Sequence, residues 1–211
     1  AGLKSTAGER LCELKDDISS FKAPRGKYSV DLFDTNFRMV GKSYEHSIQY
    51  DSINALYLLD QPGEEKSFVI SLKEQSEITQ GAQHYQHIVM NMKKNKKDIQ
   101  VRIARQQEVL SAKYKNKNGD PMLHTEMVGQ APEMVATLFK ALSGRKVIMH
   151  SKRYRTERGD VAVRATCGHN TGLLYPLAKS LIFIPKPCSI IRYNDIESIE
   201  FKRYEGQRSS N

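Results

Sequence analysis

One stretch of the sequence occurs twice, and this internal repeat constrains the fold more than any other feature. Ile48-Gln-Tyr-Asp-Ser-Ile-Asn-Ala-Leu-Tyr-Leu58 aligns without gaps with Ile191-Arg-Tyr-Asn-Asp-Ile-Glu-Ser-Ile-Glu-Phe201, at a constant offset of 143. Three positions are identical, and two exchange one large apolar residue for another. Self-similarity at a fixed offset indicates repeated structural units, although chance similarity between two strand–turn–strand units is the alternative. We therefore expect two modules, in residues 1–144 and 145–211.

The second copy is expected to be incomplete. About 84 residues follow Leu58 within the first copy, whereas ten residues follow Phe201. Residues 206–211 are polar and resemble a loop at which a fragment ends. A truncated module of this kind would have unpaired strand edges.

Alternating apolar and polar residues predict short strands throughout the first copy. Residues that alternate in this way recur every 8 to 12 positions and are separated by Gly and Pro, a spacing typical of an antiparallel barrel or sandwich. The apolar positions are Tyr28, Val30 and Leu32; Phe37 and Met39; Leu56 and Leu58; Phe68, Ile70 and Leu72; Ile99, Val101 and Ile103.

A single amphipathic helix is predicted at the end of the first copy. Its apolar residues recur at three and four positions: Met134, Val135, Leu138, Phe139 and Leu142. Pro132 suits the first turn of this helix, and Gly144 stands where a C-terminal cap belongs. We therefore expect one helix to close a strand-rich module.

The charge balance points to a polyanionic partner. Lys and Arg number 33 against 24 Asp and Glu, a formal net charge of +9. No apolar stretch approaches the ~20 residues of a bilayer span, and residues 1–10 do not resemble a signal peptide. Three cysteines cannot all pair, so we expect a soluble intracellular chain in a reducing compartment.

Basic residues gather in two segments. Residues 93–117 contain nine basic and two acidic residues, and residues 145–164 contain seven basic and two acidic residues. Charge runs are usually solvated faces, but two of them favour a binding surface for nucleic acid or another acidic partner. Val101 and Ile103 are expected to face the core, so Arg102 between them should point outward. The candidate binding residues are Lys93, Lys94, Lys96, Lys97, Arg102, Arg105, Lys152, Arg153, Arg155 and Arg158.

The sequence contains no positive sign of an enzyme. Gly41-Lys42-Ser43 resembles the end of a phosphate-binding loop, but Asn36 replaces the required Gly and a strand pattern follows. Nucleophile-elbow and His-Glu-x-x-His motifs are absent, and the acidic residues form no recognisable catalytic pair. We expect no catalytic residues and no cofactor.

Metal binding is not expected either. His84 and His87 have no third ligand nearby, and Cys167 and His169 are too close together for ordinary zinc-ligand spacing. Solvated or hydrogen-bonded histidines are the better interpretation.

Several motifs resemble a known family. Its signature in the second copy is Cys167-Gly-His-Asn-Thr-Gly-Leu-Leu-Tyr-Pro-Leu177, followed by Ile182-Phe-Ile-Pro-Lys-Pro187 and the repeat. The first copy matches it at Pro24-Arg-Gly-Lys-Tyr28, at Gly41-Lys-Ser-Tyr-Glu45, and at Gln80-Gly81 followed by Tyr85. Over nearly its whole length the chain resembles the middle domain of the structure-specific recognition protein family, the smaller subunit of the histone chaperone FACT.

This resemblance implies a mainly β fold with few helices. It would consist of tandem pleckstrin-homology modules, each a bent antiparallel sheet capped by one helix, with the second module truncated. The implied function is non-catalytic: a nuclear histone chaperone module that works with a larger subunit to reorganise nucleosomes during transcription, replication and repair. Core histones and the larger FACT subunit are the implied partners, and no membrane or small-molecule substrate is expected.

Two questions stay open at this stage. Histones are basic, so a chain of net charge +9 should not attract them over long range, and nucleosomal DNA fits the charge better. The alternative function is phosphoinositide binding, because many pleckstrin-homology folds bind these lipids through an early basic hairpin. Lys22, Arg25 and Lys27 would supply that site.

Overall fold

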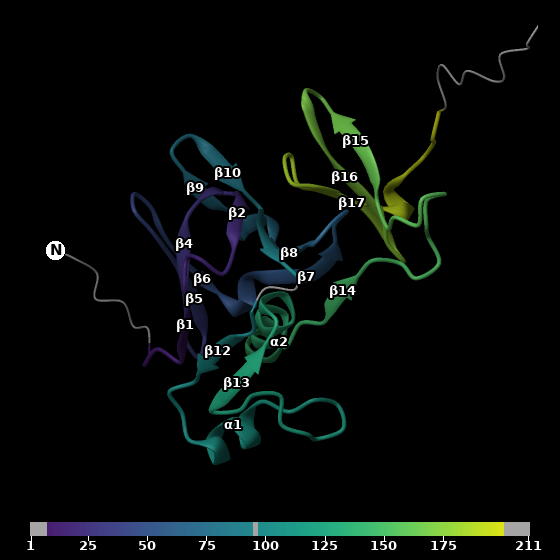
Figure 1. The fold of residues 1–211 in the computed structure, drawn as a ribbon. Coiled ribbons are helices and arrows are strands. Elements are labelled where there is room, and N and C mark those ends of the chain that lie inside the picture. Colours follow the sequence, from purple (N-terminus) through teal and green to yellow (C-terminus); the bar gives the residue numbers. More distant parts are fainter. Residues whose placement is uncertain (1–7, 95–96, 201–211) are drawn as a thin grey trace, which may run out of the picture.

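Two sheets and the longer of the two α-helices of the described chain enclose the main core of the protein (Figure 1). The computed structural model describes residues 8–94 and 97–200. The first sheet has the order β1-β4-β5-β6, with β1 Cys12–Leu14, β4 Tyr28–Leu32, β5 Asn36–Gly41 and β6 Glu45–Gln49. The 3-10 turn η1, Tyr50–Ser52, leads from β6 into the second sheet.

The second sheet has six strands in the order β14-β7-β8-β11-β2-β3, and all its pairs are antiparallel except β14 with β7. Its strands are β2 Ser20–Ala23, β3 Arg25–Gly26, β7 Ile53–Asp60, β8 Glu65–Leu72, β11 His87–Lys93 and β14 Val147–Met149. Two small antiparallel strand pairs and a 3-10 turn also belong to the first copy: η2 Glu74–Ser76, β9 Ile78–Gln80 with β10 Gln83–Tyr85, and β12 Ile99–Arg102 with β13 Glu126–Gly129. This architecture confirms the mainly β fold.

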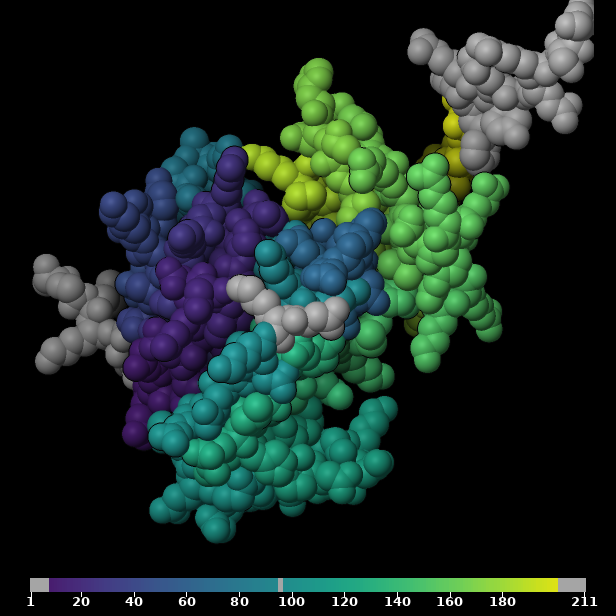
Figure 2. Space-filling model, in the orientation of Figure 1, coloured from purple at the N-terminus to yellow at the C-terminus, as the bar shows by residue number. Residues whose placement is uncertain are grey.

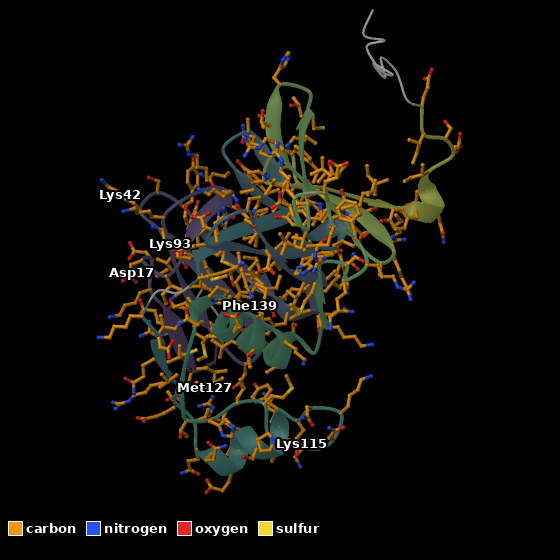
Figure 3. The ribbon with its side chains drawn as sticks, turned by 45° about the vertical axis from the view of Figure 1, so that its right-hand side comes forward. Asp17, Lys42, Lys93, Lys115, Met127 and Phe139 are labelled. Carbon is orange, nitrogen blue, oxygen red and sulfur yellow. The ribbon has the colours of Figure 1, made fainter. Side chains whose placement is uncertain are left out.

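Helix α2, Ala131–Ser143, closes the core as the sequence predicts. Pro132 lies in its first turn, and Gly144 caps it in the left-handed conformation at φ 67°. Phe139 is fully buried at the centre of the molecule (Figure 3), where its ring packs edge-on against Phe37 at 5.0 Å between centroids. The helix stabilises the module by covering the open side of the two sheets.

The expectation of a single helix is wrong, because a second helix, α1 Gln107–Lys113, lies between β12 and β13. Leu110 is the one residue of α1 that is buried. A helix of seven residues with one buried side chain produces no recurring apolar pattern in the sequence.

Both faces of the central strands are buried. Leu56 and Leu58 of β7 point into the main core, whereas Tyr57 and Leu59 point to the opposite side of the sheet. The uninterrupted apolar run in β7 reflects this double burial. A third sheet, in the order β15-β16-β17-β18, covers the outer face. Its strands are β15 Val163–Cys167, β16 Asn170–Pro176, β17 Ser180–Ile184 and β18 Ser189–Arg192.

A second hydrophobic cluster joins the third sheet to the outer face of the six-stranded sheet. Tyr175 and Ile182 are fully buried there, together with Leu59 and Val69 from the first copy. The two parts of the chain are thus packed together through an apolar interface.

The structure gives the two copies a matching strand register up to η1 and its counterpart, but residues 196–200, which align with part of β7, form no strand. Val30 pairs with Met39 in the first copy, and Leu174 pairs with Phe183 in the second, each at an offset of 144. From β6 and β18 onward the offset is 143, so η1 corresponds to η3, Tyr193–Asp195. The β17–β18 hairpin is therefore one residue shorter than the β5–β6 hairpin. Phe201, at the end of the repeat, and residues 206–211 lie outside the described residues.

Neither α-helix in the described part of the chain has the length and apolar composition that a membrane span requires.

Candidate polyanion-binding surface

Parts of the two basic segments, more than 50 residues apart in sequence, meet at the turn between β7 and β8. Lys94 follows β11, and its Nζ lies 2.9 Å from Oδ1 of Asp60 at the end of β7. His150 follows β14, and its Nδ1 lies 3.5 Å from Oδ2 of the same carboxylate. Figure 2 shows the segment after β14, in light green, beside the β7–β8 turn, in blue. Arg158 and Pro62 line one shallow groove between these segments.

We call this region the β7–β8 surface. We define it by the described candidate cations of the two segments that meet at this turn: Lys93, Lys94, Lys97, Lys152, Arg153, Arg155 and Arg158. Among the described residues, Lys93, Lys97, Lys152, Arg153 and Arg158 are exposed and form no ion pair. Arg155 is also exposed without an ion pair in the described ranges. Glu64 and Glu157 are exposed in the same segments, so the positive character depends on these six cations. Lys96 lies outside the described residues.

Asp60 organises the surface without neutralising all of it. Partial burial acts to raise its pKa, but the hydrogen bond from Lys94 and the charges of Lys66, Lys94 and His150 outweigh burial and lower it. Asp60 is therefore ionised at neutral pH and holds Lys94 in place. Lys66 lies 3.6 Å from Asp60 and 2.6 Å from Glu133 of helix α2.

Arg155 is oriented by the backbone. Its Nη1 donates hydrogen bonds to the carbonyl oxygens of Ser151 at 2.9 Å and Tyr154 at 2.6 Å. These bonds hold the guanidinium group against its own loop, and the group remains exposed.

Arg102 and Arg105 are not part of this surface. Arg102 projects outward from β12 as predicted, with its side chain 78% exposed, and its Nε contacts Glu126 at 2.9 Å. Arg105 contacts Asp34 at 2.9 Å and also pairs with Glu9. Both cations thus have carboxylate partners in the region around the paired strands β12 and β13, which lies below α2 in Figure 1.

Asp34 is the centre of a separate structural cluster. Partial burial acts to raise its pKa, but hydrogen bonds from Lys113, Arg105 and Tyr114 outweigh burial and lower it to about 2. The donor atoms of Lys113 and Tyr114 lie 2.9 and 3.0 Å from Oδ1. The cluster fastens α1 to the turn between β4 and β5, so Arg105 serves the fold.

Sequence reasoning missed Asp60, Lys66 and His150. Asp60 and Lys66 are cross-strand partners beside the β7–β8 turn. Opposite charges on either side of a predicted turn could have indicated this ion pair from the sequence. His150 had no such signal, because it reaches Asp60 only through the parallel pairing of β14 with β7.

The histidines and cysteines form no metal cluster within the described ranges. Nδ1 of His84 lies 3.0 Å from Glu77, and His87 is half-buried with a pKa lowered by burial. Cys12, Cys167 and Cys188 are free thiols.

Comparison with known proteins decides the family. The model of the SSRP1 PH domain matches residues 10–147. The chain belongs to the SSRP1 family. A second model, the middle domain of the Rttp106-like histone chaperones, matches residues 161–211. Family membership confirms the resemblance seen in the sequence, including the pleckstrin-homology fold.

Relatives in fungi, animals and plants are similar along the chain. A FACT complex subunit pob3 of Aspergillus fumigatus is 34% identical over 210 residues, which cover 100% of this chain and 35% of that protein. A FACT complex subunit ssrp1-B of Caenorhabditis elegans is 32% identical over 205 residues, covering 96% of this chain and 28% of the relative. The chain spans about a third of the length of the curated relatives it matches.

A chain of a solved structure, "Structure of the Spt16D Pob3N heterodimer", is 12% identical and has a TM-score of 0.35. The alignment covers 90% of this chain and 76% of the chain in that structure.

Proposed function

We propose that this chain is a non-catalytic module of a FACT histone chaperone that binds core histones and the larger FACT subunit in the nucleus. The observation that supports this proposal is the similarity to FACT subunits along the whole chain. In this proposal the module docks on chromatin components while nucleosomes are reorganised.

The proposed organisation is two pleckstrin-homology-like modules, in residues 1–144 and 145–211. The matched register of β4-β5-β6 and β16-β17-β18 supports it. On this division, β14 is a strand that the second module adds to the sheet of the first.

The β7–β8 surface is proposed to contact the phosphates of nucleosomal DNA. Its six cations without ion pairs lie in segments that flank a turn where Asp60 holds Lys94, and they present positive charge there. Histones, which are basic, would bind elsewhere through apolar contacts and hydrogen bonds. Histone binding should therefore respond less to salt than DNA binding does.

Duplex DNA binding by the intact chain tests the DNA part of the proposal. A variant with Lys93→Gln, Lys97→Gln and Arg158→Gln should bind more weakly, and the slope of log affinity against log salt should fall by about 3, at ~0.9 per lost phosphate contact. A matched control, Lys15→Gln with Lys73→Gln and Lys115→Gln, removes three exposed charges elsewhere. An equal effect of both variants would show that only net charge matters and would reject a localised site.

A pull-down of core histones at two salt concentrations tests the histone part. We expect retention by wild type and by the Lys93, Lys97 and Arg158 variant alike. Failure of the wild-type chain to retain histones would reject the chaperone assignment for this part of the protein.

A further inference from the structure

A second group of cations gathers at the other end of β11. We infer that Lys22, Arg25, Lys27, Lys42 and Lys186 form a second contact surface for a nucleic-acid backbone, the hairpin-tip surface. The inference rests on the proposed function in one respect, because the ligand is the same phosphate backbone. The residues involved are different.

The hairpin-tip surface combines positive charge with few acidic residues. All five cations are exposed, and among the described residues they form no ion pair. The hairpin-tip segments 20–30, 39–44, 78–86 and 184–190 contain no Asp or Glu. Glu45 and Glu77 border these segments, and each has a basic partner: Glu45 lies 3.3 Å from Arg38 and Glu77 lies 3.0 Å from His84.

One tyrosine holds three of these hairpins together. The Tyr28 hydroxyl donates a hydrogen bond of 2.9 Å to Oε1 of Gln80 in β9. Its ring packs so closely on Gly26 and Gly41 that a Cβ on either glycine would lie within 2.8 Å of a ring atom. The β2–β3, β5–β6 and β9–β10 hairpins are thereby fixed relative to one another, so their charges form a preorganised array.

The second part of the chain contributes Lys186. Ala23 of β2 lies in the same hydrophobic cluster as Ile184 and Cys188, which flank the β17–β18 turn. Figures 1 and 2 show this turn, in yellow-green, beside the β2–β3 hairpin, in purple. Lys42 and Lys186 occupy the tips of corresponding hairpins in the two copies, and Lys42 extends outward from the molecule (Figure 3).

The two surfaces are separated along the sheet. β11 runs from His87, near the β2–β3 turn, to Lys93 at the β7–β8 surface, and seven residues span about 20 Å at ~3.3 Å per residue. Phosphates along one strand of a duplex recur every ~3.4 Å of helix axis, which is much less than this separation. The hairpin tips would therefore contact different phosphates from those at the β7–β8 surface.

A nucleic acid fits the hairpin tips better than a membrane does. Membrane-binding segments insert large apolar side chains below the headgroups, but within the four tip segments Tyr44 is the only exposed one. None of the five cations lines either of the two grooves described in the structure. Positive charge spread over several hairpins suits an extended polyanion rather than a single headgroup.

Duplex binding by the intact chain tests the inference. A variant with all five cations changed to Gln should reduce the slope of log affinity against log salt by about 4.5, at ~0.9 per phosphate contact. The pair Lys42→Gln and Lys186→Gln, which changes only hairpin tips, should reduce it by about 2 and protects the test against misfolding of the larger variant. The Lys15, Lys73 and Lys115 control should reduce this slope by less than the tip variants do.

The outcomes separate this inference from the proposed function. If the slope of log affinity against log salt decreases only in the tip variants, the hairpin-tip surface is supported and the β7–β8 site is rejected. Loss only in the Lys93, Lys97 and Arg158 variant overturns the present inference. Binding to vesicles containing phosphoinositide, abolished by the tip variants while duplex binding is unchanged, would also overturn it in favour of a lipid site.

Discussion

Tyr175 occupies the position in the third sheet that Asp31 occupies in the first. Asp31 is paired across its hairpin with Arg38, and Tyr175 is paired with Ile182 at the matching register. Asp31 accepts hydrogen bonds from Arg38 at 2.9 Å and from Arg10 at 2.8 Å, whereas Tyr175 is fully buried against the first copy. The same sheet face is therefore charged in one copy and apolar in the other, so only the second copy can dock through it.

Truncating Tyr175 should weaken the packing between the two copies. Tyr175→Ala is expected to lower the free energy of unfolding by about 3–5 kcal/mol, as for other buried aromatic residues. Tyr175→Phe should have little effect, because the buried hydroxyl has no hydrogen-bond partner within the described structure. Urea denaturation measures the free energy of unfolding of both variants. Similar decreases in Tyr175→Ala and Tyr175→Phe would contradict the packing role.

Asp34 should make stability depend on pH at the acidic end. Its folded pKa of about 2 lies below its ordinary value of 3.8, so its contribution is present above pH 4 and is lost as pH falls toward 2. Asp34→Asn should cost about 2 kcal/mol at pH 7. Denaturation at pH 7 and pH 2.5 should show that the difference in free energy of unfolding between variant and wild type becomes smaller at pH 2.5. An equal difference at both pH values would contradict this role of Asp34.

Arg105 should matter for stability and not for binding. Arg105→Gln removes a donor to Asp34, so the melting temperature should fall. The salt dependence of duplex binding should match wild type, because this guanidinium is already occupied by Asp34 and Glu9. A decrease in the salt slope would place Arg105 in the binding surface after all.

Gly172 should tolerate no side chain. A Cβ there would lie 2.2 Å from the carbonyl oxygen of Ile184 and 2.6 Å from Cζ of Phe183, so Gly172→Ala should cost about 1–3 kcal/mol. Gly129→Ala is the matched control, since its nearest neighbour, Cε of Met134, would be at an ordinary 3.5 Å. Equal thermal stability of the two variants would contradict this close packing.

Elements with a strong local pattern could be predicted from the sequence. Helix α2 and strands β4, β5 and β12 have regular apolar spacing, β7 and β8 are rich in apolar residues, and the repeat located β6 with η1 and β18 with η3. The short strands β1 and β14 depend on pairing partners elsewhere in the chain, and β3 has only two residues, so their own residues contain too little pattern to predict them.

The sequence predicted which segments are basic, but not which of their cations are available to a partner. The sequence identified both basic segments, but ten candidate cations look alike until their neighbours are known. Lys94 is held by Asp60 and Arg105 by Asp34, and in each case the carboxylate comes from a different part of the chain. Which cations remain available to a partner is a property of tertiary structure.

Binding to reconstituted nucleosomes tests the central claim most directly. We predict that the intact chain binds nucleosomes and that Lys93→Gln, Lys97→Gln and Arg158→Gln together lower the affinity at least about tenfold near physiological salt. The Lys15, Lys73 and Lys115 control should change it by much less. Nucleosome affinity that is unaffected by the first variant would contradict an account in which the β7–β8 surface contacts DNA.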